Sequence, residues 1–353
     1  MRLVKVEKLK NGNKIAKTIL SADGTVLLGQ GVNLTPRYIK RLQEIGISSV
    51  YIVDERFPDL EVKDIVSETT RTESVKITKQ IIERIRKGQD LESPKVLGTI
   101  NGIIDDLLSQ DSLVVNLNDI RTYDDYTFGH SVNVCILSLL IGITLGYDQI
   151  KLRNLGIGAI LHDLGKVYLP SSILQKNSCL TLEEFKEVQK HCQLGFEIIR
   201  ANQELNILSA HVALQHHERY DGRGYPQGLK GENILEFARI VAIADVYDAL
   251  SSDRPYRKRY LPHEIYEYMM ASCYSIFDPK LMAHFLKYIP PYPIGTLVRL
   301  NTKEKAIIIK QNDTCLIRPI VRVTTETDHA PNNPIEYNLL ENPTILVEEL
   351  LPD

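Results

Sequence analysis

Paired cysteines are missing from this sequence. Its cysteines are odd in number, scattered along the chain and never arranged as Cys-x-x-Cys: Cys135, Cys179, Cys192, Cys273 and Cys315. This pattern excludes a disulfide scaffold and argues against a cysteine-rich structural zinc site. It is typical of reduced, mostly buried thiols in a cytoplasmic protein.

A long apolar run and a secretory signal are also missing. The first residues, Met1 to Lys5, contain no apolar signal-peptide core. The most apolar stretch, residues 132–145, is shorter than the roughly 20 residues that a membrane-spanning helix needs. We therefore interpret it as a buried core helix, and we expect a cytoplasmic protein with no membrane partner.

The sequence has no large excess of charge of either sign. Its formal net charge of -3 argues against general binding to nucleic acid, but it leaves room for a local basic cluster that binds a small anion. A P-loop, a supported Gly-x-Gly-x-x-Gly motif and a Ser-His-Asp order are absent as well. Their absence disfavours a kinase, a dinucleotide-dependent dehydrogenase and a serine hydrolase.

What is present predicts a mainly α-helical protein with a smaller part at each end. Residues 1–55 are expected to form a small α/β unit, with a hairpin turn at Asp23-Gly24 and a helix beginning at Thr35-Pro36. We interpret this unit as regulatory or as the site of homodimer formation. Residues 56–90 suit a connector helix. Residues 91–289 read as helical nearly throughout, and a capping box at Thr181-Leu182-Glu183-Glu184 predicts the start of one helix. Residues 290–353 predict a small β module, with strand-like runs at 296–300, 306–309, 320–323 and 345–347.

Histidine and aspartate residues recur in or beside the apolar helical patterns of the middle region. In chain order the candidates are His130, His162-Asp163, His191, His216-His217 and Asp245. A titratable side chain on a core-facing helix is costly unless something satisfies it, and several such side chains can share one cation. A single buried histidine is more often a structural residue, so the ordered set on consecutive helices carries the metal-site hypothesis.

The number of candidate ligands bears on the number of metals. One tetrahedral site needs only four ligands, and this set is larger. Imidazole suits zinc, iron, manganese or nickel, and a carboxylate can bridge two ions. Two cations lower the pKa of bound water to about 7 and hold a phosphate during in-line displacement. The residues therefore predict a two-metal phosphoesterase.

The same residues carry a family resemblance. The segments His-Asp-Leu-Gly-Lys at 162–166, Gln-His-His-Glu-Arg-Tyr-Asp-Gly-Arg-Gly-Tyr-Pro at 215–226, and Ala-Asp-Val-Tyr-Asp-Ala-Leu at 244–250 closely resemble the HD-GYP subgroup of the HD superfamily of metal-dependent phosphohydrolases. The likeness covers residues 95–285. It implies an all-helical HD-type catalytic domain that hydrolyses the bacterial second messenger cyclic di-GMP to pGpG, and in some members on to GMP.

The resemblance also implies the cofactor and the roles of individual residues. Non-haem iron or manganese is expected in preference to zinc. One side of the metal cluster is implied to consist of His130, His162 and Asp245, the other side of His191, His216 and His217, with Asp163 as the bridge. Some members add a glutamate four residues before the first histidine and bind a third metal. Tyr126 stands at that position, so we expect two metals and pGpG as the main product.

Substrate contacts are expected from basic residues near the ligands. Lys166 follows His162 at i+4 and would share its face if the helix continued, where it could bind a phosphate oxygen. The resemblance assigns phosphate contacts to Arg254 and Arg257. Tyr225 is expected either near the substrate or as a support for the histidine pair, and Asp248 as a partner of a ligand histidine.

Two alternatives to cyclic di-GMP hydrolysis remain open at this stage. One is the same chemistry on another cyclic dinucleotide. The other is a catalytically silent receptor that binds the nucleotide and signals through its terminal parts, and the complete ligand set argues against it.

Overall fold

The computed structural model describes residues 1–21, 25–47, 49–62, 64–110, 113–115, 126–176, 178–251, 260–324 and 334–351. The turn predicted at Asp23-Gly24 and the phosphate contacts predicted for Arg254 and Arg257 lie outside the described residues.

The first residues form a small α/β unit. Strand β1 (Arg2–Lys5) leads into the short 3-10 helix η1 (Val6–Lys8) and pairs antiparallel with β4 (Ser49–Ile52), while β2 (Ile19–Leu20) pairs with β3 (Val26–Leu28). Helix α1 (Pro36–Glu44) begins as predicted, because the Thr35 hydroxyl accepts a hydrogen bond from the Tyr38 N–H. The unit has its own apolar core, which includes Ile15 and Val50.

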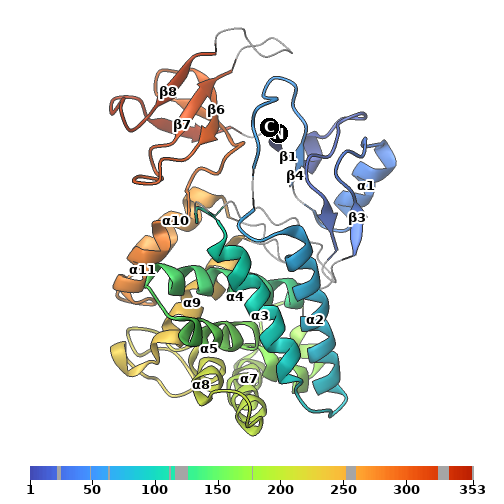
Figure 1. The fold of residues 1–353 in the computed structure, drawn as a ribbon, viewed down its shortest axis with the longest axis vertical. Coiled ribbons are helices and arrows are strands. Elements are labelled where there is room, and N and C mark those ends of the chain that lie inside the picture. The colour runs from blue at the N-terminus through green and yellow to red at the C-terminus, as the bar shows by residue number, and fades with distance from the viewer. Residues whose placement is uncertain are drawn as a thin grey trace.

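The middle of the chain is a helical domain, which confirms the predicted fold class (Figure 1). Its elements are α2 (Glu68–Arg86), α3 (Ser93–Leu108), α4 (Tyr126–Thr144), α5 (Gln149–Ile160), η3 (Leu164–Tyr168), α6 (Ser171–Leu174), α7 (Leu182–Ala201), α8 (Ile207–Gln215), η4 (Gly231–Asn233), α9 (Glu236–Ser251), α10 (Pro262–Ala271) and α11 (Pro279–Leu286). The capping box predicted at Thr181 opens α7, with Glu184 as its second member.

Helix α4 contains the apolar stretch that the sequence suggested as a core helix. Its residues from Val132 to Ile141 are buried, and α4 packs against α2, α5, α9 and α11. Among the described residues, no helix combines the length and the apolar character that crossing a bilayer requires. The interpretation as a core helix is therefore confirmed.

The C-terminal residues form a five-stranded antiparallel sheet in the order β8-β7-β6-β5-β9. The strands are β5 (Leu297–Leu300), β6 (Lys305–Lys310), β7 (Ile320–Val323), β8 (Glu336–Asn338) and β9 (Val347–Leu350). Strands β5 to β7 lie where the sequence predicts them, β9 begins two residues later than the predicted run, and β8 was not predicted. The division of the chain at 55, 90 and 289 stays a prediction.

Candidate metal centre

The His162-Asp163 pair lies in the turn between α5 and η3. Helix α5 ends at Ile160 and η3 begins at Leu164, so no α-helix continues from His162 to Lys166. The shared helical face that the i+4 spacing suggested is therefore absent. Lys166 instead approaches the neighbouring aspartate, with its Nζ 2.5 Å from Asp163 Oδ2.

Gly165 brings this turn against α7. A Cβ built at Gly165 would stand 2.0 Å from the carbonyl oxygen of His191 and 2.6 Å from the backbone nitrogen of Gly195. Both atoms belong to the backbone of α7, which cannot move aside as a flexible side chain can. A glycine after the pair is therefore what allows the turn to meet the helix that carries His191.

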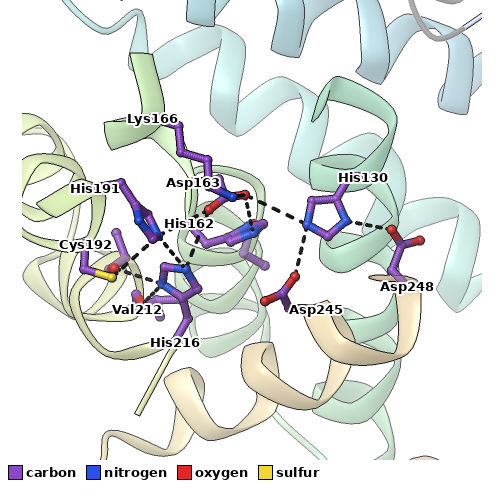
Figure 2. A network of polar contacts seen from close by, with 12 residues as sticks. His130, His162, Asp163, Lys166, His191, Cys192, Val212, His216, Asp245 and Asp248 are labelled. Carbon is purple, nitrogen blue, oxygen red and sulfur yellow. Dashed lines mark hydrogen bonds and ion pairs between the residues drawn. The ribbon is translucent and has the colours of Figure 1, made fainter. Parts of the chain in front are cut away.

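All seven candidate ligands come together in one cluster. They form two groups, in each of which one donor atom per residue lies within 4.8 Å of the others: Asp163, His191, His216 and His217 in the first group, and His130, His162 and Asp245 in the second. His130 comes from α4, His191 from α7, His216 and His217 from the C-terminal end of α8, and Asp245 from α9. Figure 2 shows how the labelled members converge from these elements.

Asp163 lies between the two groups, and its two oxygens face different imidazoles. Oδ1 is 3.5 Å from His191 Nε2 and 3.7 Å from His216 Nε2. Oδ2 is 3.3 Å from His162 Nε2 and 4.0 Å from His130 Nε2. This is the arrangement that a carboxylate bridging two cations requires.

Three of the imidazoles are oriented by backbone carbonyl groups. The Nδ1 atoms lie at hydrogen-bond distance from the carbonyl oxygen three residues earlier: 2.7 Å for His162 and Ala159, 2.6 Å for His191 and Val188, and 2.9 Å for His216 and Ala213. A carbonyl oxygen only accepts, so each Nδ1 carries the proton. Each Nε2 therefore presents a lone pair to the centre of the cluster.

His130 is oriented by a carboxylate. Its Nδ1 lies 2.6 Å from Asp248 Oδ2, which confirms the contact expected between Asp248 and a candidate ligand histidine (Figure 2). Its Nε2 lies 3.1 Å from Asp245 Oδ1. With Nδ1 protonated, the neutral ring would direct a lone pair at this carboxylate, an arrangement that is repulsive unless a positive charge lies there.

Two buried atoms at the centre support the presence of a cation. Within the part of the chain that the structure describes, His162 Nε2 and Asp163 Oδ1 have no hydrogen-bond partner. A buried polar atom left unsatisfied costs about 1–3 kcal/mol. One or more cations between the two groups would satisfy these atoms together with the other lone pairs that converge there, so the residues present fit a metal site.

The protonation states of His191, His217 and Asp163 agree with this fit. Burial lowers the pKa of His191 to about 3 and holds the pKa of His217 well below its usual value, so both rings are neutral as metal ligands must be. Burial alone would raise the pKa of Asp163, but the neighbouring Lys166 and His162 hold it well below its usual range. His130 differs from these residues. Burial alone would lower its pKa, but its contacts with Asp245 and Asp248 raise it to about 9, so that without a cation the ring is protonated and donates to both carboxylates.

The loop after the histidine pair packs against the cluster. The ring of Tyr225 stacks on His217 with 4.8 Å between centroids and meets Phe185 edge-on at 5.8 Å. The stacking favours a role of Tyr225 in holding His217, one of the two roles that the sequence left open. Gly224 allows the loop to turn closely, because a Cβ there would stand 2.3 Å from the backbone nitrogen of Arg219.

Two residues that support the site were missed at the level of the sequence. Buried Glu218 accepts hydrogen bonds from the N–H groups of Gln227 (2.7 Å) and Leu229 (2.9 Å), and so ties the loop together. Buried Asn133 donates to Asp248 Oδ1 at 2.7 Å. A signal existed for Asn133, since it is a polar residue inside the apolar stretch 132–145.

Comparison with known proteins supplies the family. A family model described as HD domain matches residues 115–281. A cyclic di-GMP phosphodiesterase of Pseudomonas aeruginosa is 36% identical over 238 residues, which are 67% of this chain and 57% of that protein. The cyclic di-GMP phosphodiesterase response regulator RpfG of Xanthomonas campestris is 41% identical over 149 residues, 42% of this chain and 39% of that protein.

A relative with a different substrate is also similar. The 3′3′-cGAMP-specific phosphodiesterase 2 of Vibrio cholerae is 35% identical over 191 residues, which are 54% of this chain and 37% of that protein. The chain thus spans less than two thirds of the length of each of these three relatives. The matched HD domain and the ordered histidine, aspartate and Gly-Tyr-Pro motifs lead to one conclusion: the chain belongs to the HD-GYP family of HD-domain proteins.

Proposed function

We propose that this chain is a metal-dependent phosphodiesterase that hydrolyses cyclic di-GMP to pGpG, with two divalent ions of iron or manganese as cofactors. The observation that carries the proposal is the position of Asp163, whose two carboxylate oxygens face different groups of imidazoles. Similarity to the cyclic di-GMP phosphodiesterases of Pseudomonas aeruginosa and Xanthomonas campestris supports the substrate class.

The ligand set would divide between two ions. His130, His162 and Asp245 would hold one, and His191, His216 and His217 the other, with Asp163 shared between them. Two divalent ions would supply a nucleophile from water at neutral pH and neutralise charge on the phosphate. The backbone carbonyls behind the imidazoles would keep these ligands in place without reorganisation during the reaction.

Lys166 would bind the phosphate beside this cluster. Its side chain is 32% exposed and lies next to Asp163, so its ammonium group is within reach of both the solvent and the cluster. A cation at this place would stabilise the charge that develops on a non-bridging oxygen. Arg254 and Arg257 are proposed to bind the phosphates of the substrate as well, and Tyr225 to border the nucleotide while it supports His217.

Removal of a proposed metal ligand tests the mechanism. We expect His162→Ala and Asp163→Ala to abolish hydrolysis of cyclic di-GMP and to reduce bound metal at the same time, measured by product chromatography and by metal analysis of anaerobically purified protein. The matched control is His211→Ala, which removes a half-buried histidine of α8 outside the cluster and should preserve both quantities. Full activity in a metal-depleted His162 or Asp163 variant would refute the mechanism.

A second candidate substrate is 3′3′-cGAMP, and the similarity to the Vibrio cholerae enzyme specific for it favours this candidate. A panel of cyclic di-GMP, 3′3′-cGAMP and cyclic di-AMP separates the two readings. We expect cyclic di-GMP to be cleaved fastest and pGpG to accumulate ahead of GMP. Cleavage of 3′3′-cGAMP alone would assign the other substrate, and tight binding of a nucleotide without any cleavage by metal-loaded protein would assign a receptor role.

A further inference from the structure

A line of hydrogen bonds connects helix α2 to the metal cluster. Arg71 of α2 donates from Nη1 to Asn133 Oδ1 at 2.6 Å, and Asn133 donates from Nδ2 to Asp248 Oδ1 at 2.7 Å. The other oxygen of Asp248 lies 2.6 Å from Nδ1 of His130. Three consecutive contacts therefore run from the first turns of α2, through α4 and α9, to a candidate ligand.

The hydrogen-bonding groups of Arg71 and Asp248 fix the orientation of the Asn133 amide between them. A guanidinium group only donates and a carboxylate only accepts, so the Asn133 amide has one satisfactory orientation, with its oxygen toward Arg71 and its nitrogen toward Asp248. Both Asn133 and Asp248 are 2% exposed, so water does not readily replace either contact. Loss of Arg71 leaves the Asn133 oxygen without this buried donor and frees the amide to turn away from Asp248.

Helix α2 links the N-terminal unit to elements of the candidate metal site. It follows the segment that leaves β4, and its N-cap residue Ser67 is held to α3 by a 2.8 Å hydrogen bond from its backbone N–H to Asp106. In Figure 1, α2 lies beside α3 and α4 directly below the N-terminal unit. It also packs against η3, the element that contains Lys166.

We propose that Arg71 is a positioning residue which sets the orientation of His130 through Asn133 and Asp248, and thereby sets the affinity of the cluster for the ion on the His130 side. The inference rests on the proposed metal-dependent function and deepens it, because it gives the N-terminal part of the chain a physical route to the metal site. A displacement of α2 that breaks the contact between Arg71 and Asn133 then weakens metal binding, although Arg71 itself does not contact the metal.

Metal titration of substrate-free protein tests this route. The full chain is depleted of metal, and Mn²⁺ affinity is measured by calorimetry for wild type, Arg71→Met, Arg71→Lys and Arg86→Met. Loss of a direct partner of a metal ligand typically costs 10–100-fold in affinity. For Arg71, which acts through two further side chains, we expect Arg71→Met to lose roughly 3- to 10-fold for one ion. Arg71→Lys should recover most of the loss, and Arg86→Met, at the exposed end of the same helix, should match wild type.

A double-mutant cycle separates the route from general destabilisation. If the effect passes through Asn133, Arg71→Met adds nothing in an Asn133→Ala background, because residues of one network are not additive. Wild-type Mn²⁺ affinity in Arg71→Met overturns the inference, and so do losses that simply add. Failure of the proposed function is a separate result: metal-loaded wild type that does not cleave cyclic di-GMP, while its Mn²⁺ affinity still depends on Arg71, removes the substrate and leaves the route in place.

Discussion

The contact that orients His130 joins residues much farther apart in the sequence than the contacts that orient His162, His191 and His216. The latter three donate from Nδ1 to a carbonyl oxygen only three residues earlier in the chain. The orientation of each is therefore set locally, by the backbone of its own helix end or turn. His130 depends on Asp248, 118 residues away, so its orientation also depends on how α4 and α9 pack. Among these four candidate ligands, His130 is thus the one most open to influence from the rest of the molecule.

At Gly165, the addition of a single methyl group should lower the stability of the protein strongly. In Gly165→Ala the new methyl group would collide with the backbone of α7 at His191, and neither backbone can yield cheaply. We expect the free energy of unfolding, measured by urea denaturation, to fall by about 3 kcal/mol, and bound metal to fall with it. The control is Gly98→Ala, an exposed position of α3 with open space around it, where alanine should stabilise the helix by up to about 1 kcal/mol. Equal stability of the two variants would contradict the close packing.

Short-range and long-range parts of the site differ in how far the sequence predicts them. The ligand candidates were predictable because each stands in a motif of a few residues, and their nitrogen and oxygen atoms have few other uses in an apolar setting. Asn133 and Glu218 were missed because their roles arise from partners that only the fold brings near. The Asn133 to Asp248 contact, for example, joins residues 115 positions apart.

At the scale of helices and strands, the sequence predicted the start of a helix correctly where a capping residue marks it. Thr35 and Thr181 cap helices as expected, because a hydroxyl that accepts from a free N–H needs only its own turn. The end of α5 was less clear, since nothing in Leu161-His162-Asp163 is a strong helix breaker. Strand β8 (Glu336–Asn338) was missed because it is short and is held by pairing with β7. Pairing between strands is not visible in the local pattern.

The loop that contains Tyr225 depends on one carboxylate. Glu218 accepts from Gln227 and Leu229, and a glutamine at this position could satisfy only one of these N–H groups. We expect Glu218→Gln to lower the free energy of unfolding by about 1–3 kcal/mol. Amide exchange at residues 221–229 should become faster, and catalytic activity should fall as Tyr225 leaves His217. Glu232→Gln, whose side chain is 73% exposed, is the control and should change stability by less than about 0.5 kcal/mol. Unchanged exchange in Glu218→Gln would contradict this role.

At the scale of the whole molecule, the N-terminal segment and the C-terminal sheet form a common core. Phe57 and Leu60 are buried together with Ile307 of β6. Beside them, Arg322 of β7 forms a two-pronged ion pair with Asp59, at 2.8 and 2.7 Å. The sequence suggested two separate accessory parts, because contacts between residues about 250 positions apart leave no local pattern. Their contact means that a change in one part can be felt in the other, and α2 begins directly after this region.

Phe57 should therefore hold two distant parts of the chain at once. Its side chain is 3% exposed, and truncation of a buried phenylalanine to alanine typically costs about 3–5 kcal/mol. In Phe57→Ala we expect amide exchange to become faster both in β4 of the N-terminal unit and in β6 of the C-terminal sheet, while α4 of the helical domain keeps its protection. Tyr38→Ala, an aromatic residue of α1 that is 41% exposed, is the control and should leave all three elements protected. Faster exchange in β4 alone would mean that the two parts fold independently, and equal loss in α4 would mean that the common core and the helical domain unfold as one unit.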